Sequence, residues 1–213
     1  KKFRYSSQNA DRVIAVSQQT KNDLIEFFSI EESKIDVIYQ GCNEIFMRKL
    51  SPEDRNEIIK KYNLPDNYLL FVGTLEERKN LFQVVKALHE YKIDIPLVAI
   101  GKPTKYLERI KEYITSKQVK GITFLHNVPT EDLPSLYQNA TVFIYPSVFE
   151  GFGIPILEAL WSKVPVITSK GGCFNEVGGE FSKYINPEST VEIANAINEI
   201  LSNSHTREVM INN

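Results

Sequence analysis

The sequence predicts an α/β fold in which helices cover both faces of a doubly wound parallel sheet. Short apolar runs alternate along the chain with segments whose apolar residues recur every three or four positions. The apolar runs are nearly continuous, which is typical of strands buried on both faces of a parallel sheet. Strands are expected at residues 68–72, 96–100, 122–125, 141–145, 164–168 and, more weakly, 183–185.

The segments between these runs predict helices, because each carries a single apolar face. The faces consist of Leu81, Val84, Val85 and Leu88, then Leu107, Ile110 and Ile114, then Leu133, Leu136, Tyr137 and Ala140, and last Val191, Ala194, Ile197 and Leu201. Thr130 and either Ser189 or Thr190 are placed to cap the third and fourth of these helices. The alternation as a whole predicts a Rossmann-like domain.

A smaller β-α-β unit precedes this domain. Residues 12–16 and 34–39 have the pattern of strands, and residues 18–28 have the pattern of a helix between them. Residues 41–54 have the composition of a connection. The chain therefore divides into a leading unit at 1–45, a connection with a first helix at 46–66, and the larger Rossmann-like domain at 67–213.

Composition excludes several classes of protein. The 213 residues are 42% hydrophobic and carry a net charge of −2, which argues against a sequence-independent grip on nucleic acid. No apolar run reaches the roughly 18–20 residues of a membrane span, and the N-terminus lacks the apolar core of a signal peptide, so the expected compartment is the cytoplasm. Cys42 and Cys173 are isolated in the sequence and are expected to be reduced thiols rather than metal ligands.

The most informative stretch is a glycine-rich turn with a glutamate at each end, which we call the elbow (residues 150–158). It follows the expected strand at 141–145 and reads Glu150-Gly151-Phe152-Gly153-Ile154-Pro155-Ile156-Leu157-Glu158. Two glycines permit close approach of the backbone to a ligand, and Pro155 suits the start of a helix. Free N–H groups and the positive end of the helix dipole predict a phosphate or diphosphate site there.

The two glutamates need a different partner, because a carboxylate repels a bound diphosphate. Glu150 and Glu158 are suited to accept hydrogen bonds from the hydroxyl groups of a sugar or a ribose. Taken separately, Gly-x-Gly is explained as a tight turn and Glu158 as a first-turn residue favoured by the dipole. The combination instead describes a nucleotide sugar, a phosphate flanked by sugar hydroxyls.

A second loop carries two cations where a helix is expected to begin. The expected strand at 68–72 runs into Gly73-Thr74-Leu75-Glu76-Glu77-Arg78-Lys79-Asn80. Cations at a helix N-terminus oppose the dipole by roughly a few tenths of a kcal/mol each, which a bound anion would offset. The fork of Arg78 and the point charge of Lys79 suit a diphosphate. Solvated surface cations are the alternative, but ligands of open α/β sheets bind at the carboxyl ends of strands.

Together these motifs resemble the group 1 class of retaining glycosyltransferases, which have the two-domain GT-B architecture. The resemblance extends to Ala10-Asp11-Arg12-Val13-Ile14-Ala15-Val16-Ser17 in the leading unit. It implies transfer of a sugar from a nucleotide-diphosphate sugar to an acceptor with retention, in polysaccharide or glycoconjugate biosynthesis. It also implies a fragment that holds the donor-binding domain and the end of the acceptor domain, and that stops before a final crossover helix.

The resemblance implies a role for each matched residue. Glu150 would contact the donor sugar near the reacting carbon, as the catalytic residue, and Glu158 would hold the ribose hydroxyls. Lys79 matches a phosphate-binding lysine, whereas Thr74 stands where the family has an arginine, for which Arg78 is expected to substitute. The other expected donor contacts are Gly73, Asn127, Val128, Ser147, Gly151, Phe152, Gly153 and Ile154.

Two further segments resemble family loops less specifically. His126-Asn127-Val128-Pro129 resembles a loop that holds the nucleotide base largely through backbone groups, so the base itself is poorly encoded. A capping or surface position explains His126 better than a ligand contact. Residues 171–177 resemble a later glycine loop near the donor, and a simple turn explains them equally well.

The expected chemistry needs no cofactor. Lys79, Arg78 and the amides of Phe152 to Ile154 would stabilise the charge that develops on the leaving diphosphate. No Asp-x-Asp pair occurs in the sequence, so the usual sign of a divalent-metal glycosyltransferase is missing and metal-independent transfer is expected.

Other functions remain as alternatives. A binding module would hold a nucleotide sugar and catalyse nothing, since the acceptor pocket would belong to the missing part of the first domain. An NAD-dependent enzyme would need a Gly-x-Gly-x-x-Gly after an early strand, which the sequence lacks. A glycosidase is a weaker alternative. The acceptor, whether a sugar, a lipid-linked molecule or another compound, is not encoded, and the intact protein could lie at the inner face of the membrane.

Overall fold

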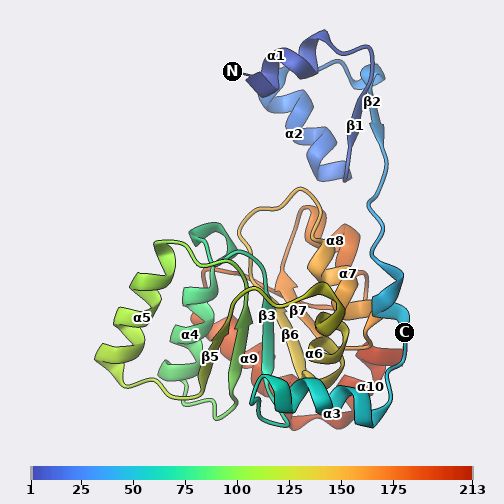
Figure 1. The fold of residues 1–213 in the computed structure, drawn as a ribbon. Coiled ribbons are helices and arrows are strands. Elements are labelled where there is room, and N and C mark those ends of the chain that lie inside the picture. The colour runs from blue at the N-terminus through green and yellow to red at the C-terminus, as the bar shows by residue number, and fades with distance from the viewer. Residues whose placement is uncertain (1, 213) are drawn as a thin grey trace.

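The computed structural model of this chain describes residues 2–212 and confirms the predicted α/β fold. Lys1 and Asn213, the outer limits of the predicted domains, lie outside the described residues. A leading unit lies above the larger domain, and an extended connection joins the two along one side (Figure 1).

The leading unit contains a parallel two-stranded sheet and two helices. Its elements are α1 (Lys2–Asn9), β1 (Val13–Ala15), α2 (Gln18–Phe28), the 3₁₀ turn η1 (Glu32–Lys34) and β2 (Ile35–Val37). A small core of Ala15, Leu24, Ile30 and Ile35 holds them together. The β-α-β unit was expected, whereas α1 was not. Six of the eight residues of α1 are polar or charged, and the other two, Phe3 and Tyr5, give no helical apolar period.

The connection is more ordered than the sequence suggests. A 3₁₀ turn η2 (Glu44–Met47) leads to α3 (Pro52–Lys61), so the expected connection at 41–54 overlaps the first turn of this helix. Ser51 caps α3 by accepting a hydrogen bond from the amide of Asp54 at 3.0 Å, and Pro52 stands in its first turn. The helix expected within 46–66 therefore begins earlier than predicted, before the expected end of the connection at residue 54, and these helix-start signals explain why.

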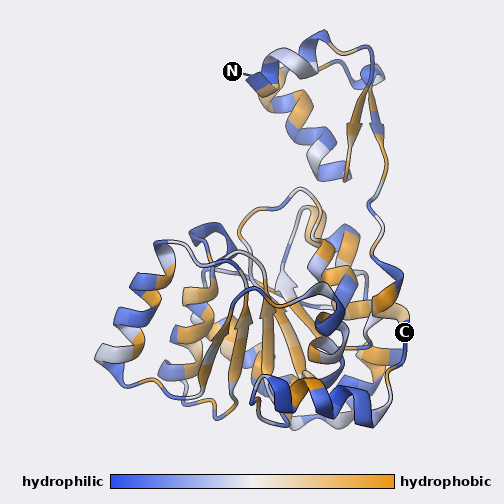
Figure 2. Cartoon of the chain, viewed as in Figure 1, coloured by the Kyte–Doolittle hydropathy of each residue, from blue (hydrophilic) through white to orange (hydrophobic). Residues whose placement is uncertain are grey.

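A six-stranded parallel sheet forms the centre of the larger domain, with the order β5-β4-β3-β6-β7-β8. The strands are β3 (Leu69–Val72), β4 (Leu97–Ile100), β5 (Ile122–Leu125), β6 (Val142–Tyr145), β7 (Val166–Ser169) and β8 (Lys183–Ile185). All the expected strands are present. β5 and β8 have the predicted boundaries, and the boundaries of the others move by one or two residues. The strands at the centre of this sheet are coloured mostly as hydrophobic residues, whereas the helices around them carry both hydrophobic and hydrophilic residues (Figure 2).

Helices cover both faces of this sheet. They are α4 (Leu81–Glu90), α5 (Tyr106–Lys117), α6 (Leu133–Asn139), α7 (Ile154–Trp161), α8 (Cys173–Gly178), α9 (Thr190–Ser202) and α10 (Ser204–Asn212), with 3₁₀ turns η3 (Glu77–Lys79) and η4 (Thr130–Asp132). Helices α4, α5 and α9 bury one face of the strands, and α3, α6, α7 and α8 lie against the other. Successive strand residues alternate between the two cores: Leu69 belongs to the core that contains α4, and Leu70 to the core that contains α3.

The two predicted helix caps had different outcomes. Ser189 caps α9, since its hydroxyl accepts from the amide of Glu192 at 3.2 Å. Thr130 does not act as a side-chain cap, and that prediction is wrong. A 3₁₀ turn begins at Thr130 instead, and a backbone hydrogen bond from the Asp132 amide to the Pro129 carbonyl, at 3.1 Å, closes it.

The strand order creates one switch point in the sheet. From β3 the chain proceeds outward to β4 and β5, then returns to add β6, β7 and β8 on the other side of β3. Ligands of doubly wound sheets bind in the crevice at the carboxyl ends of such diverging strands. The loops after β3 and β6 are therefore the first place to look for a site. Within residues 2–212 there is no helix of the length and apolar character that a bilayer span requires.

Candidate functional site

The loops after β3 and β6 meet at the switch point. The β3 loop carries Arg78 and Lys79 in the turn η3, and the β6 loop carries Ser147 and Glu150. A backbone hydrogen bond from the Val148 amide to the Arg78 carbonyl, at 3.0 Å, ties the two loops together. Segments some seventy residues apart in sequence thus form one surface.

A carboxylate between two cations is the centre of this surface. Lys79 Nζ lies 2.6 Å from Glu150 Oε1, and Arg78 Nη1 lies 2.7 Å from Glu150 Oε2. The side chains of Lys79 and Glu150 are only 10% and 11% exposed, whereas that of Arg78 is 39% exposed. Arg78 Nη1 also donates to the Phe149 carbonyl at 2.5 Å, and its Nη2 pairs with Glu76 at 2.8 Å.

Arg78 and Lys79 therefore do not lie unpaired at a helix N-terminus, as the sequence predicted. They lie in η3, one or two residues before Asn80, which has a left-handed φ of 61° at the start of α4. The anion that offsets them here is Glu150 of the chain itself. Sequence reasoning identified all three residues but did not foresee that they pair with one another.

Tyr145, at the end of β6, belongs to the same cluster and was missed as a site residue. Its hydroxyl donates to Glu150 Oε1 at 2.9 Å and accepts a hydrogen bond from Lys79 Nζ, which also lies 4.7 Å from the centre of its ring. A tyrosine that ends a buried strand needs a partner for its hydroxyl, which is the signal that could have found it.

These contacts set the ionisation of the cluster. Burial alone would raise the pKa of Glu150, but the hydrogen bonds from Lys79 and Arg78 outweigh it and hold that pKa below its ordinary value. Burial, and then the Glu150 charge, raise the pKa of Tyr145. Glu150 is therefore a carboxylate, and Tyr145 a neutral hydroxyl, at neutral pH.

Ser147 lies behind Glu150 and is fully buried. Its carbonyl accepts from the Ser169 hydroxyl at 2.6 Å, which fixes the backbone just before the elbow. Its own hydroxyl is close enough to Glu150 to help lower the pKa of that carboxylate, although it makes no hydrogen bond of ordinary geometry with the described residues.

The elbow has the predicted strand–turn–helix form. Gly153 has φ 113° at the N-cap of α7, and Pro155 stands in the first turn of that helix. A Cβ at Gly153 would lie 3.2 Å from Ile156 Cδ1, so both backbone and packing favour glycine there. Phe152 is buried, and Gly151 and Ile154 are partly exposed.

Glu158 has surroundings unlike those of Glu150. It lies within α7 with no cation paired to it in the described part of the chain, and it accepts a hydrogen bond from the Tyr137 hydroxyl at 2.8 Å. Burial raises the pKa of Glu158, and the Tyr137 bond only partly offsets the rise. Burial, with Glu158 nearby, also raises the pKa of the Cys42 thiol to about 11.

A row of loops extends from the cluster along the carboxyl edge of the sheet. Nδ1 of the His126 ring lies 2.8 Å from the Gly101 carbonyl oxygen, so the loop after β5 contacts the loop after β4. A Cβ at Gly101 would lie 1.9 Å from the Gly73 carbonyl oxygen, so the loop after β4 touches the loop after β3 with no space for a side chain.

This row determines where the remaining predicted contacts lie. Gly73 and the half-buried Thr74 open the β3 loop beside Lys79. Asn127 is exposed with φ 56°, and Val128 is half-buried. Both belong to the β5 loop, two strands from β3, and among the described residues no hydrogen bond or ion pair joins them to Glu150. The predicted base loop and the predicted sugar site are thus separate parts of one edge.

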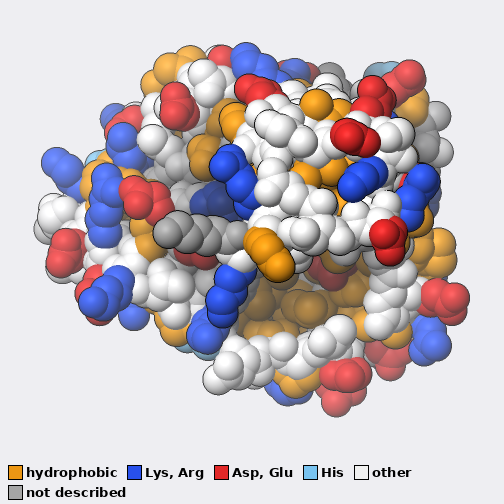
Figure 3. All heavy atoms as spheres, turned by 90° about the horizontal axis from the view of Figure 1, so that it is seen from above, with side chains coloured by type: hydrophobic (Ala, Val, Ile, Leu, Met, Phe, Trp, Pro, Cys, Tyr) orange, Lys and Arg blue, Asp and Glu red, His pale blue; other side chains and the backbone are white. Residues whose placement is uncertain are grey.

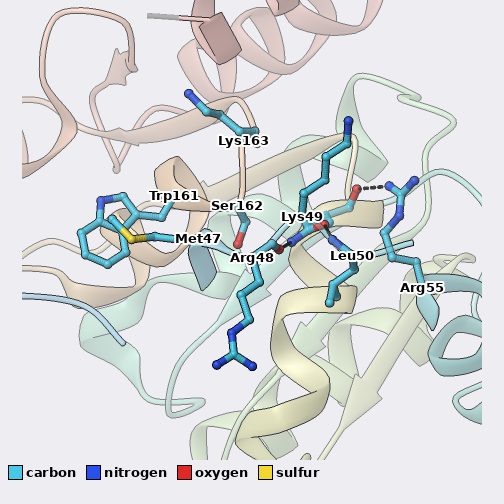
Figure 4. Close-up of a pocket in the computed structure, with 9 residues that line it drawn as sticks. Met47, Arg48, Lys49, Leu50, Arg55, Trp161, Ser162 and Lys163 are labelled. Atoms are coloured by element: carbon cyan, nitrogen blue, oxygen red, sulfur yellow. Dashed lines mark hydrogen bonds between the residues drawn. The ribbon is translucent and has the colours of Figure 1, made fainter. Parts of the chain in front are cut away.

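A cavity of about 480 Å³ lies away from this site, at the end of α7 opposite the elbow. It is lined by Met47, Arg48, Lys49, Leu50, Arg55, Gln138, Trp161, Ser162 and Lys163. The charged ends of the four cations point away from one another (Figure 4). Because the cations do not converge, the cavity has no focused anion site, and the switch point remains the candidate site.

Charge on the surrounding surface is mixed. Seen from the end where the leading unit lies, basic and acidic side chains are interspersed over the molecule (Figure 3). This face therefore lacks the one-signed field with which a protein attracts nucleic acid without regard to sequence.

Both parts of the chain are similar to known glycosyltransferases. A sequence profile described as "Glycosyl transferases group 1" matches residues 54–213, and one described as "Glycosyltransferase Family 4" matches residues 1–44. The chain is 30% identical over 215 residues to the O-antigen chain mannosyltransferase B of Escherichia coli. That match covers 98% of this chain and 56% of the relative.

A second relative shows the same proportions. The O-antigen chain mannosyltransferase RfbU of Salmonella typhimurium is 30% identical over 199 residues, which cover 93% of this chain and 53% of the relative. The chain thus spans about half the length of the curated relatives it matches.

Solved structures agree with this fold. A glycosyltransferase from Rickettsia africae superposes with a TM-score of 0.82 at 25% identity, covering 100% of this chain and 62% of that one. HepE of Anabaena, crystallised with UDP-glucose, superposes with a TM-score of 0.87 at 22% identity, covering 98% of this chain and 58% of that one. The latter likeness concerns the fold alone.

Proposed function

Because this chain belongs to the group 1 glycosyltransferase family, we propose that it forms the donor-binding part of an enzyme that transfers a sugar from a nucleotide-diphosphate sugar. The observation that carries the proposal is the cluster of Lys79, Arg78, Tyr145 and Glu150 at the switch point. It places cations suited to a diphosphate beside a carboxylate suited to a sugar, at the edge where such folds bind ligands.

In the proposed complex the donor diphosphate lies against Arg78, Lys79 and the amides at the start of α7. The bond between the anomeric carbon and the diphosphate oxygen breaks, and its electron pair leaves with the diphosphate. The cations and amides stabilise that leaving group, as fixed charges and dipoles do most effectively in a site that excludes water. We propose that this requires no metal ion.

Glu150 is assigned to the sugar. When the diphosphate binds Lys79 and Arg78, these two cations are shared between it and the Glu150 carboxylate. Glu150 can then accept hydrogen bonds from sugar hydroxyls. Its negative charge also favours the positive charge that develops at the anomeric carbon. We propose that the acceptor hydroxyl forms the new bond with retention of configuration, giving its proton to the departing phosphate.

Glu158 is assigned to the ribose. It is held by Tyr137, lies in α7 at the end of the elbow, and keeps a carboxylate oxygen that is not paired with a cation among residues 2–212. Hydrogen bonds from vicinal hydroxyls would stabilise its ionised form and so offset the burial that now raises its pKa.

The mannosyltransferase names of the relatives make an activated mannose the first donor to test, and polysaccharide assembly the proposed setting. UDP-glucose is the second, from the HepE complex. The acceptor would be bound by segments beyond this chain, whose relatives are about twice as long. A nucleotide-sugar binding module without catalysis is the second candidate function.

The deciding experiment is calorimetric titration of the chain with UDP, GDP, ADP and NAD, with and without EDTA. Metal-independent saturation by one nucleoside diphosphate, lost in Lys79→Ala and Glu158→Ala but kept in the exposed control Lys183→Ala, is the expected result. Binding of NAD alone would contradict the proposal. The longer parent protein, assayed for transfer with GDP-mannose and UDP-glucose, separates an enzyme from a binding module.

A further inference from the structure

The leading unit contacts the elbow directly, through the start of α2. The hydroxyls of Ser17 and Thr20 both donate to the carbonyl oxygen of Gly151, at 2.6 and 3.0 Å. Ser17 is fully buried, and 134 positions separate it from Gly151. One carbonyl of the elbow thus receives two hydrogen bonds from the other unit of the chain.

A carboxylate of the larger domain makes a second contact, with the N-terminus of α2. Glu176 of α8 accepts from the amide of Gln18 at 2.7 Å and from that of Gln19 at 3.0 Å. The first amides of a helix have no acceptor within the helix, and its dipole favours a negative charge there. Glu176 therefore supplies the hydrogen-bond acceptor for these two amides and the negative charge at the N-terminus of α2.

Aromatic and backbone contacts complete the junction. The rings of Tyr39 and Phe152 stack, with centroids 5.9 Å apart. A hydrogen bond to Glu176 is the main cause that raises the pKa of Tyr39. A Cβ at Gly151 would lie 3.6 Å from Val16 Cγ2, so the leading unit packs closely on the elbow backbone.

We propose that this junction, the elbow clasp formed by Ser17, Thr20, Tyr39, Phe152 and Glu176, is a positioning device by which the leading unit sets the geometry of the donor site. The inference rests on the proposed function. Ser17, Thr20, Tyr39 and Glu176 do not need to touch the donor, and Phe152 is assigned to it only through its backbone amide. The restraint acts through Gly151, which lies between Glu150 and Phe152 in the chain.

The physical route is the peptide plane between Gly151 and Phe152. It carries the Gly151 carbonyl on one side and the Phe152 amide, assigned to the diphosphate, on the other. Two hydrogen bonds to that carbonyl fix the orientation of the plane, since a planar peptide cannot turn one group without the other. Glycine before it offers little resistance to rotation, so the restraint has to come from outside the elbow.

The clasp can be observed without any ligand. In the free start of α2, the Gln18 and Gln19 amides have no protection except through Glu176. Residue-resolved amide exchange on the whole chain should show both amides protected, and Glu176→Ala should accelerate their exchange about tenfold. Glu199→Ala, which removes an exposed carboxylate paired with Lys183, should leave both rates unchanged.

The positioning role has a separate readout. Thr20→Val removes one hydroxyl with little change in shape, and should shift and broaden the NMR amide signal of Phe152. Ser116→Ala, which removes an exposed hydroxyl bonded to a carbonyl within α5, is the matched control and should leave that signal in place. A Phe152 signal identical in Thr20→Val and the unaltered chain would overturn the proposal, as would unprotected Gln18 and Gln19 amides in the unaltered chain.

Binding then tests whether this restraint reaches the donor. Thr20→Val and Glu176→Ala should weaken binding of the free nucleoside diphosphate and of its sugar derivative, each by about fivefold, because the Phe152 amide is assigned to the diphosphate that both ligands carry. Unchanged binding of both ligands in these variants would contradict the positioning role. If the unaltered chain binds no nucleotide, the proposed function fails, while the Phe152 signal still decides whether the clasp orders the elbow.

Discussion

The ammonium nitrogen of Lys79 lies 2.6 Å from a carboxylate oxygen of Glu150, although 71 positions separate the two residues. Their side chains are 10% and 11% exposed, so each neutralises a charge that the interior would otherwise disfavour strongly. The stability of this end of the sheet and the chemistry proposed for it therefore depend on the same pair.

Removing one partner of this pair should destabilise the chain more than removing both. Glu150→Gln alone will lower the free energy of unfolding by about 3 kcal/mol, because the buried Lys79 charge is left without a carboxylate. Lys79→Met alone will lower it by less, because Glu150 keeps its ion pair with Arg78. The double variant will lose less than the sum of the two, as measured by urea denaturation. Lys183→Met, in a pair 39% and 46% exposed, serves as the control, with an expected loss of about 0.5 kcal/mol. Strictly additive losses would show that the pair is not coupled.

The acid side of the stability profile should depend on Glu150. Its folded pKa lies below the ordinary value of 4.5, so its ionised form stabilises the fold above that pH. The contribution is lost as pH falls through the lowered folded pKa. Melting temperatures recorded from about pH 3 to pH 7 should therefore decline less steeply with acid in Glu150→Gln. Glu158 has a raised pKa, so Glu158→Gln should show no such flattening at low pH.

The contact between the loops after β3 and β4 should not tolerate a methyl group. Gly101→Ala places a Cβ 1.9 Å from the Gly73 carbonyl, so the backbone must move, at an expected loss of about 3 kcal/mol. Gly41→Ala is the matched control, since nothing lies within 4 Å of its Cβ, and should change stability by about 0.5 kcal/mol or less. Thermal unfolding of both variants measures the difference, and similar melting temperatures would refute the tight contact.

The two glutamates of the elbow should differ in nucleotide binding. Glu158→Ala should weaken binding of the free nucleoside diphosphate about tenfold, because a ribose contact is present whether or not the sugar is. Glu150→Ala should weaken it less, because the sugar is absent and Lys79 and Arg78 are released to the phosphates. Calorimetric titration of both variants tests this. Equal effects would contradict the separate roles assigned to them.

Local patterns were enough for most of the fold. The strands of the large sheet are continuous apolar runs, and α2 begins and ends where the sequence predicts, at Gln18 and Phe28. Helix α1 escaped prediction because its polar surface has no clear apolar period, and the start of α3 was predicted too late because its capping signals stood inside a presumed connection. These failures follow from weak amphipathicity, since periodicity reports burial rather than helix formation itself.

The site was predicted residue by residue but not as an arrangement. Glycines, a proline and paired glutamates identify the elbow, because each residue type answers a local backbone or chemical need. The bonds from Lys79 to Glu150 and from Thr20 to Gly151 join distant segments. Such partners depend on how the strands are ordered in the sheet, which no local spacing encodes.

The strand order also has a consequence during synthesis of the chain. Strand β3 pairs with β4 on one side and with β6 on the other, and β6 leaves the ribosome only after α4, β4, α5, β5 and α6. Until then one edge of β3, with its apolar residues Leu69 to Val72, has no partner, and unpaired apolar edges promote aggregation. The half-sheet β3-β4-β5 must therefore survive as a nascent intermediate before the site at the switch point can exist.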